Sequence, residues 1–141
     1  MSVGPRLFLL GDGEVLDALA ELAGRLRYAE VHRSDDPPVA TPPLGADDYV
    51  VVSSRDGKRA RELLAAVLAA GDPAYLGLVA SEKEWLVALL KLHADRVGKA
   101  KLDRISAPAG SATGAETVDE QAIAVAAELI AARRKQPASK Q

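Results

Sequence analysis

The 141 residues include 18 basic and 20 acidic side chains, and the net charge of −2 is spread along the chain. This distribution excludes the concentrated basic patches of nucleic-acid and acidic-membrane binders. Because the chain has no cysteine and only two histidines, disulfides, thiolate chemistry and cysteine-ligated metals are excluded, and we expect no metal centre.

The first apolar stretch contains Arg6 and is too short for the core of a signal peptide, and no later stretch has the length of a membrane span. We therefore expect a soluble, cytoplasmic protein with neither a membrane nor a nucleic-acid partner. Residues 1–134 are expected to form one domain, and residues 135–141 a disordered tail.

Short apolar runs alternate with helix-like segments, which is typical of βαβ units around a parallel sheet. The runs predict strands near residues 6–10, 28–32, 49–53, 75–80 and 104–106, with a proline-rich loop over 35–45. Helical spacing and capping boxes predict helices over 14–26, 58–70, 81–97 and 117–134, the last with Ile123, Ala126, Ala127 and Ile130 on one face. The sequence thus predicts a three-layer, doubly wound, Rossmann-like α/β fold. Its mainly parallel sheet of about five strands should have the order 3-2-1-4-5 or a close variant, with the first strand central.

Gly11 and Gly13 lie between the first strand and the first helix, where glycines let backbone N–H groups approach a nucleotide pyrophosphate. Leu16 stands where the full motif has a third glycine, so we expect compromised packing of helix on strand there. Where an acid would bind ribose, the chain has Arg33, which could accept a 2′-phosphate. A tight turn without any cofactor fits the pattern equally well, and NAD(P) binding is expected to be weak or absent.

A second candidate is the loop from Gly110 to Gly114, between the last strand and the last helix. Ser111 and Thr113 offer hydroxyl groups there, and Glu116 follows at the mouth of the loop. The alternative is that the glycines only let the loop pack and that Glu116 favours the helix dipole.

Templates for catalysis are missing from the sequence. No tyrosine is followed four residues later by lysine, and there is no phosphate-binding P-loop and no nucleophile elbow. We therefore expect no catalytic residue.

Because parallel strands end at one edge of a sheet, we expect a ligand or partner to bind at the segments that follow them. Helix N-termini at this edge favour an anion such as phosphate, whereas nearby acidic side chains oppose it. The candidate residues are Gly11, Asp12, Gly13, Arg33, Ser54, Arg55, Asp56, Ser81, Gly110, Ser111, Thr113, Gly114 and Glu116.

Four segments together resemble the C-terminal Rossmann-like domain of the XdhC/CoxI family over about residues 6–134. They are Gly11-x-Gly13-x-Val15, Asp48 to Val52, Tyr75 to Ser81, and Pro108-x-Gly110-x-x-x-Gly114-Ala115-Glu116-Thr117 through Ile123. The resemblance implies an accessory role in maturing molybdenum hydroxylases such as xanthine dehydrogenase and carbon monoxide dehydrogenase. It also implies binding of the molybdenum cofactor and assistance in its sulfuration and insertion.

The chain departs from this family where polar candidate ligands are usual. The family typically has His at Glu14, Gly at Leu16, His at Arg55, Gly-Ser-Arg at Ala80-Ser81-Glu82, His at Ser106 and Asp at Ala112. Full-length members also have a separate N-terminal domain, and this chain resembles only their second half. We therefore expect a non-catalytic maturation factor that binds a molybdenum hydroxylase or its maturation proteins. Two alternatives stay open: a nucleotide-binding, oxidoreductase-like domain, and a ligand-free interaction domain that forms a homodimer.

Overall fold

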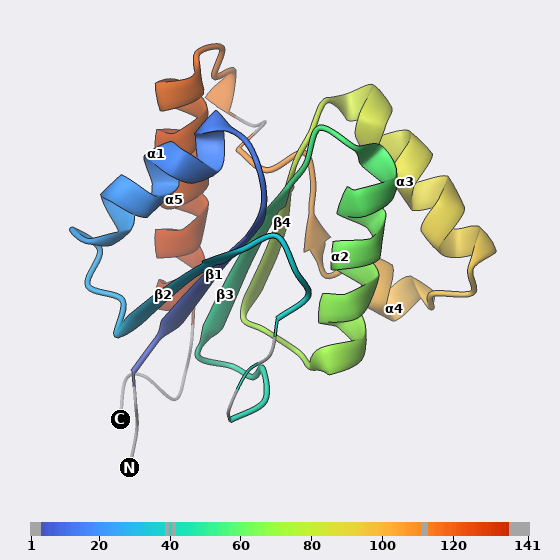
Figure 1. Cartoon of the computed structure of the whole chain (residues 1–141), viewed down its shortest axis with the longest axis horizontal. Coiled ribbons are helices and arrows are strands. Elements are labelled where there is room, and N and C mark those ends of the chain that lie inside the picture. The colour runs from blue at the N-terminus through green and yellow to red at the C-terminus, as the bar shows by residue number, and fades with distance from the viewer. Residues whose placement is uncertain (1–3, 39, 41, 111–112, 136–141) are drawn as a thin grey trace.

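A computed structural model describes residues 4–38, 40, 42–110 and 113–135 of the chain. Strands and helices alternate along most of its length (Figure 1). In chain order they are β1 (Arg6–Gly11), α1 (Glu14–Ala23), β2 (Glu30–Ser34), β3 (Asp48–Ser53), α2 (Gly57–Ala70), β4 (Tyr75–Val79), α3 (Glu82–Ala94), α4 (Lys99–Leu102), β5 (Ile105–Ser106) and α5 (Val118–Arg134).

All neighbouring strands pair in parallel, and the sheet has the order β2-β1-β3-β4-β5. This order is a variant of the expected 3-2-1-4-5, but the expected central position of the first strand was wrong, because β3 is central and β2 lies at the edge. The side chains of β2 explain the difference: Glu30, His32 and Arg33 are exposed, and an interior strand would bury them. The order still reverses beside β1, between β1 and β3, as a doubly wound sheet requires.

Helices cover both faces of the sheet and form the three expected layers (Figure 1). On one face α1 and α5 pack against Leu7, Leu9 and Val51. On the other, α2, α3 and α4 pack against Phe8, Val50 and Val52. The successive residues of β3 therefore enter alternate cores, which is why this central strand has an uninterrupted apolar sequence.

Helix starts agree with the sequence to within one residue, and so do the ends of α2 at Ala70 and α5 at Arg134. Ser81 and Thr117 form the two predicted capping boxes, with Glu84 and Glu120 as their partners. In contrast, α1 ends at Ala23 and α3 at Ala94, and the short helix α4 was not predicted.

Most of the apolar face predicted for the last helix is exposed: Ile123, Ala127 and Ile130 face solvent, whereas Ala126 is buried. Ile123 and Ile130 are 60% and 41% exposed, while Val125 and Leu129 are fully buried. Because α5 is rich in alanine on every side, its apolar spacing does not define a unique buried face.

A buried ion pair ties the N-terminal ends of β1 and β3 together. The Arg6 guanidinium donates hydrogen bonds to both carboxylate oxygens of Asp48, at 2.7 and 2.8 Å. Asp48 also accepts the N–H of Gly45, and Arg6 donates to the carbonyl of Pro42. The pair therefore anchors the end of the proline-rich loop. It lies at the N-terminal edge of the sheet, opposite the C-terminal edge where the candidate residues lie.

Candidate functional site

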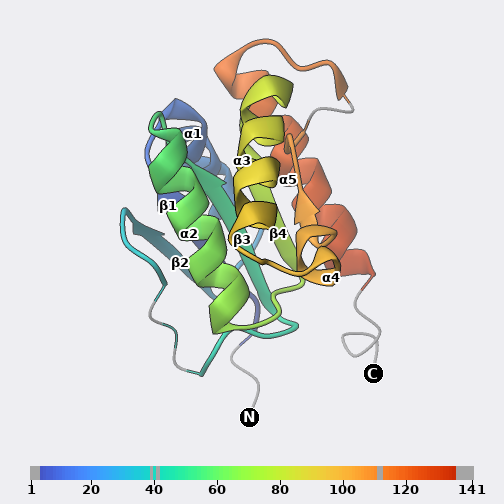
Figure 2. The ribbon, with the colours of Figure 1, turned by 90° about the vertical axis from the view of Figure 1, so that its right-hand side faces the viewer.

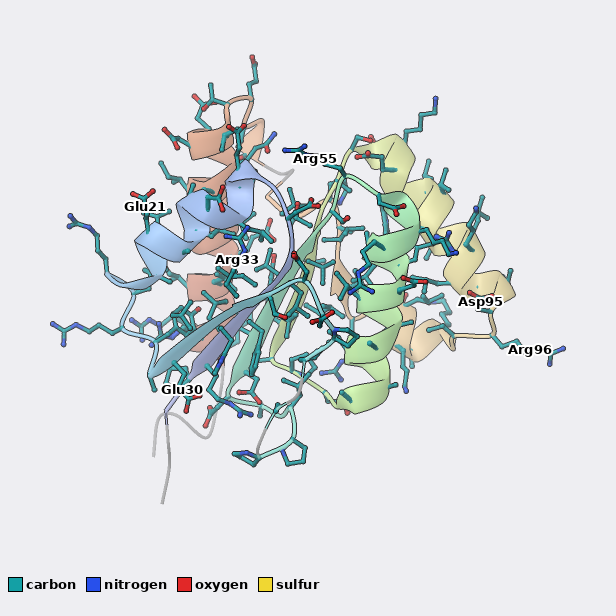
Figure 3. All side chains as sticks on the ribbon, viewed as in Figure 1. Glu21, Glu30, Arg33, Arg55, Asp95 and Arg96 are labelled. Atoms are coloured by element: carbon teal, nitrogen blue, oxygen red, sulfur yellow. The ribbon has the colours of Figure 1, made fainter. Side chains whose placement is uncertain are left out.

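The segments expected to form a site do meet at the C-terminal edge of the sheet. The turn after β1, the turn after β3, Ser81 after β4 and the loop after β5 all leave the sheet in the same direction. Figure 3 places Arg55 at this edge, between the helices of the two faces. In the described part of the chain, the Arg55 side chain has no hydrogen-bond or ion-pair partner.

Asp12 bridges the turns after β1 and β3 at the strand-order reversal. Its backbone N–H donates to the carbonyl of Ser53 at 2.8 Å, and its Oδ1 accepts the N–H of Arg55 at 3.1 Å. The turns after β1 and β3 are thereby joined across the reversal. Asp12 places a carboxylate where a pyrophosphate would have to approach, which opposes binding of an anion there.

Gly11 and Gly13 both require the absence of a side chain, for different reasons. A Cβ on Gly11 would lie 1.8 Å from the carbonyl oxygen of Ser53, so β1 and β3 approach too closely there for any other residue. Gly13 has φ +114°, a backbone conformation that L side chains rarely adopt. A Gly13→Val substitution would therefore strain the backbone and could not separate ligand binding from stability.

Leu16 does not weaken the packing of α1. Its side chain is fully buried among Leu7, Leu9 and Tyr49, so it fills the space between helix and sheet. The expectation of compromised packing at this position was wrong, because a leucine can replace close backbone approach with side-chain burial.

Arg33 forms an ion pair with a carboxylate on α1. Its Nη1 donates to Asp17 Oδ1 at 2.7 Å, an ion pair between two partly exposed side chains. To bind a 2′-phosphate, the guanidinium would have to leave this carboxylate or share it. Arg33 also lies on the edge strand β2, apart from the loops after β4 and β5.

Three other polar candidates cap turns and helices. Ser54 Oγ accepts the N–H of Asp56, Asp56 Oδ1 accepts the N–H of Lys58 at the start of α2, and Ser81 Oγ accepts the N–H of Glu84 at the start of α3. These contacts give each side chain a structural role. They also leave less hydrogen-bonding capacity for a ligand.

Hydrogen bonds with its own side chains and with α5 also fix the loop after β5. Thr113 Oγ1 donates to the carbonyl of Gly110 at 2.9 Å and accepts the N–H of Ala115. Gly114 and Glu116 are exposed, and the N–H of Glu116 donates to Glu120 Oε1. Ser111 lies outside the described residues.

Glu128, on α5, is the residue that sequence reasoning missed. Its carboxylate accepts hydrogen bonds from the Tyr75 hydroxyl, the Ser106 hydroxyl and the N–H of Gly110, at 2.7, 3.0 and 2.6 Å. The pKa of Tyr75 is raised well above its usual range. Burial is the largest cause, and the hydrogen bond to Glu128 is the second. The available signal was an acid three residues after the core residue Val125 and directly before Leu129.

A hollow of about 680 Å³ lies between the end of β4 and the Gly110 loop. Ser81 and Gly110 share its lining with Glu82, Glu84 and Gln121. The two acids make this hollow unsuited to phosphate or another anionic group, despite the helix N-terminus beside it. Its polar lining suits an uncharged or basic group of a partner.

Comparison with known proteins gives a consistent result. The family model of the XdhC Rossmann domain matches residues 7–129. The "uncharacterized protein YqeB" of Escherichia coli (strain K12) is 31% identical over 156 aligned residues, covering 94% of this chain and 28% of YqeB. A crystal structure described as a xanthine dehydrogenase from Bacillus halodurans has a TM-score of 0.71 at 20% identity, covering 96% of this chain and 45% of that one. This chain thus spans less than half of either protein, and the second likeness concerns the fold.

Proposed function

The chain belongs to the family of the XdhC Rossmann domain, and from this membership we propose that it is an accessory module in the maturation of a molybdenum hydroxylase. Xanthine dehydrogenase and carbon monoxide dehydrogenase are the enzymes that this family suggests. The match over residues 7–129, nearly the whole described chain, is the observation that carries the proposal.

We propose that the module acts by binding and not by catalysis. The candidate side chains Asp12, Asp56, Ser81 and Thr113 hold turns and cap helices. Such contacts keep the edge of the sheet rigid, which favours recognition of a partner with little loss of entropy. The partner is the hydroxylase itself or another of its maturation proteins, and the proposed compartment is the cytoplasm. No helix in the part of the chain that the structure describes has the length and apolarity of a membrane span.

The molybdenum cofactor carries a phosphate group, and the hollow beside Ser81 and Gly110 does not fit it. Glu82 and Glu84 line that hollow, and Asp12 occupies the reversal between β1 and β3. We therefore propose no step in which this edge of the sheet holds the cofactor.

Deletion of the gene in its own organism tests the proposal. The expected result is a loss of hydroxylase activity with unchanged amounts of the hydroxylase polypeptide, and restored activity when the full chain is supplied again. A molybdenum enzyme of a different class serves as the control and should keep its activity. Unchanged hydroxylase activity in the deletion strain would refute the proposed role.

Binding of NAD(P) is the second candidate function. The positive φ values of Gly11 and Gly13 and the strand–turn–helix around them favour it. The carboxylate of Asp12 and the pairing of Arg33 with Asp17 oppose it.

A further inference from the structure

One face of α3 turns large apolar side chains toward solvent. Leu86, Val87 and Leu90 are 54%, 46% and 69% exposed, although they all lie on one helix. Their spacing places them together on the side of the helix opposite the buried Leu92. Single exposed apolar residues are ordinary, whereas several large ones on the same side of one helix favour an interaction surface.

A groove of about 280 Å³ between α2 and α3 continues this apolar surface. Figure 2 shows the two helices side by side on one face of the sheet. Val87 belongs to the lining of the groove, and the buried side chains of Ala60, Leu78 and Ala88 line it more deeply. An apolar side chain of a partner could therefore enter between the helices and would not merely rest on α3.

Basic side chains surround the groove. Lys58 and Arg61 come from α2, Lys83 and Lys91 come from α3, and Glu84 is the one acid among the lining residues. Glu84 Oε1 already accepts the N–H of Ser81 at 2.7 Å. Among the described residues, no side-chain hydrogen bond or ion pair engages any of the four cations.

A second copy of this chain does not suit this surface. A symmetric dimer presents the same patch on both sides, so the cations of one protomer would face those of its partner. Like charges across an interface repel and suppress the contact. The same arrangement favours a partner that brings carboxylates.

We propose that the α2–α3 face, the groove together with exposed Leu86 and Leu90, is the docking surface for an acidic, amphipathic segment of a partner protein. Apolar side chains of that segment would enter the groove beside Val87 and cover the two leucines. Its carboxylates would pair with the basic rim, speeding the encounter and fixing its register. This inference goes beyond the proposed function, because it specifies the chemistry of the partner whatever its identity.

Photo-crosslinking in the cells that make the protein tests this surface. The full chain carries p-benzoylphenylalanine in place of Leu90 or, in a second version, Leu86. We expect an adduct with another protein, at a segment in which acidic residues flank apolar ones. Lys83→Glu together with Lys91→Glu should reduce the adduct at least tenfold. Arg25→Glu together with Lys99→Glu, the same charge change away from the groove, should leave it unchanged.

Circular dichroism of the purified variants shows that they fold, so a lost adduct reports on docking. An adduct with a second copy of this chain, an adduct at a segment without acids, or an adduct insensitive to Lys83→Glu and Lys91→Glu would overturn the proposal. So would the absence of an adduct at both positions. Hydroxylase activity in the deletion strain is a separate measurement, so either proposal can fail while the other stands.

Discussion

The hydroxyl of Tyr75 on β4 donates a hydrogen bond to Glu128 Oε1 on α5, at a distance of 2.7 Å. The same carboxylate accepts the Ser106 hydroxyl of β5 and the N–H of Gly110. One side chain therefore fixes the last helix, two strands and the start of the loop that leads to the candidate site.

Replacing Glu128 by alanine should destabilise the protein by about 2 to 4 kcal/mol, because three donors lose their acceptor. Glu128→Gln should cost less, since its amide oxygen can still accept. Urea unfolding measures both, and Glu21→Ala, at an exposed acid on α1 (Figure 3), is the matched control with an expected change of about 0.5 kcal/mol or less. An effect of Glu128→Ala no larger than that of Glu21→Ala would contradict this role.

Stability should fall as the pH rises above about 10, the ordinary pKa of tyrosine. Burial raises the pKa of Tyr28 to about 12 and that of Tyr75 further. Folding thus favours the protonated phenols: their contribution is fully present below pH 10 and is lost as the pH rises toward the folded-state values. We expect absorbance at 295 nm to show little tyrosinate at pH 10 in the folded protein, and the free energy of unfolding to depend less on pH in Tyr75→Phe. Half-ionised tyrosines in the folded protein at pH 10 would contradict the raised pKa values.

The buried pair of Arg6 and Asp48 should show strong coupling in a double-mutant cycle. Asp48→Ala alone should cost about 3 to 5 kcal/mol, because it leaves a buried guanidinium unpaired. Arg6→Met combined with Asp48→Leu should cost much less than the sum of the single changes. Additive effects in chemical denaturation would show that the pair contributes no interaction of its own.

Shortening a side chain on the buried face of α5 should destabilise the protein more than shortening one on the exposed face. Leu129→Ala should cost about 2 to 5 kcal/mol, as expected for a buried leucine, whereas Ile123→Ala should cost about 1 kcal/mol or less. Thermal unfolding of the two variants checks the assignment of the buried face. Equal losses would mean that Ile123 is buried in solution.

NAD and NADP should bind with a dissociation constant no tighter than about 10 μM, equivalent to about −7 kcal/mol. The carboxylate of Asp12 and the engagement of Arg33 by Asp17 oppose the pyrophosphate and the 2′-phosphate. Titration calorimetry with each nucleotide measures this directly. Tighter binding would show that the glycine turn favours nucleotide binding more strongly than Asp12 and the pairing of Arg33 with Asp17 oppose it.

Local signals in the sequence were sufficient for most of the elements and for the caps of α3 and α5. Local signals were not sufficient for the strand order, because the order depends on which strands pair with β1 on its two sides. The polar residues Glu30, His32 and Arg33 could have indicated an edge strand. The buried face of α5 was equally ambiguous, because Ile123 and Leu129 are both apolar and only packing distinguishes them.

The sequence predicted that the candidate segments lie at one edge of the sheet, but not the contacts that their side chains make. Parallel strands bring Asp12, Ser54, Ser81 and Gly110 to one edge whatever their side chains do. That Asp12 bridges two turns, or that Glu128 holds Gly110 from a distant helix, depends on contacts between segments remote in sequence. Spacing within one segment carries no signal for such contacts.

The two outer strands of the sheet bear on how the protein behaves at high concentration. Fibrillar growth requires an unpaired strand edge that can template another chain. β2 presents Glu30, His32 and Arg33 at one margin, and β5 at the other has only two residues, followed closely by Pro108, which lacks an N–H. The charged side chains of β2 and the short length of β5 both disfavour pairing with a strand of another chain. The folded protein should therefore resist strand-by-strand polymerisation even at high concentration.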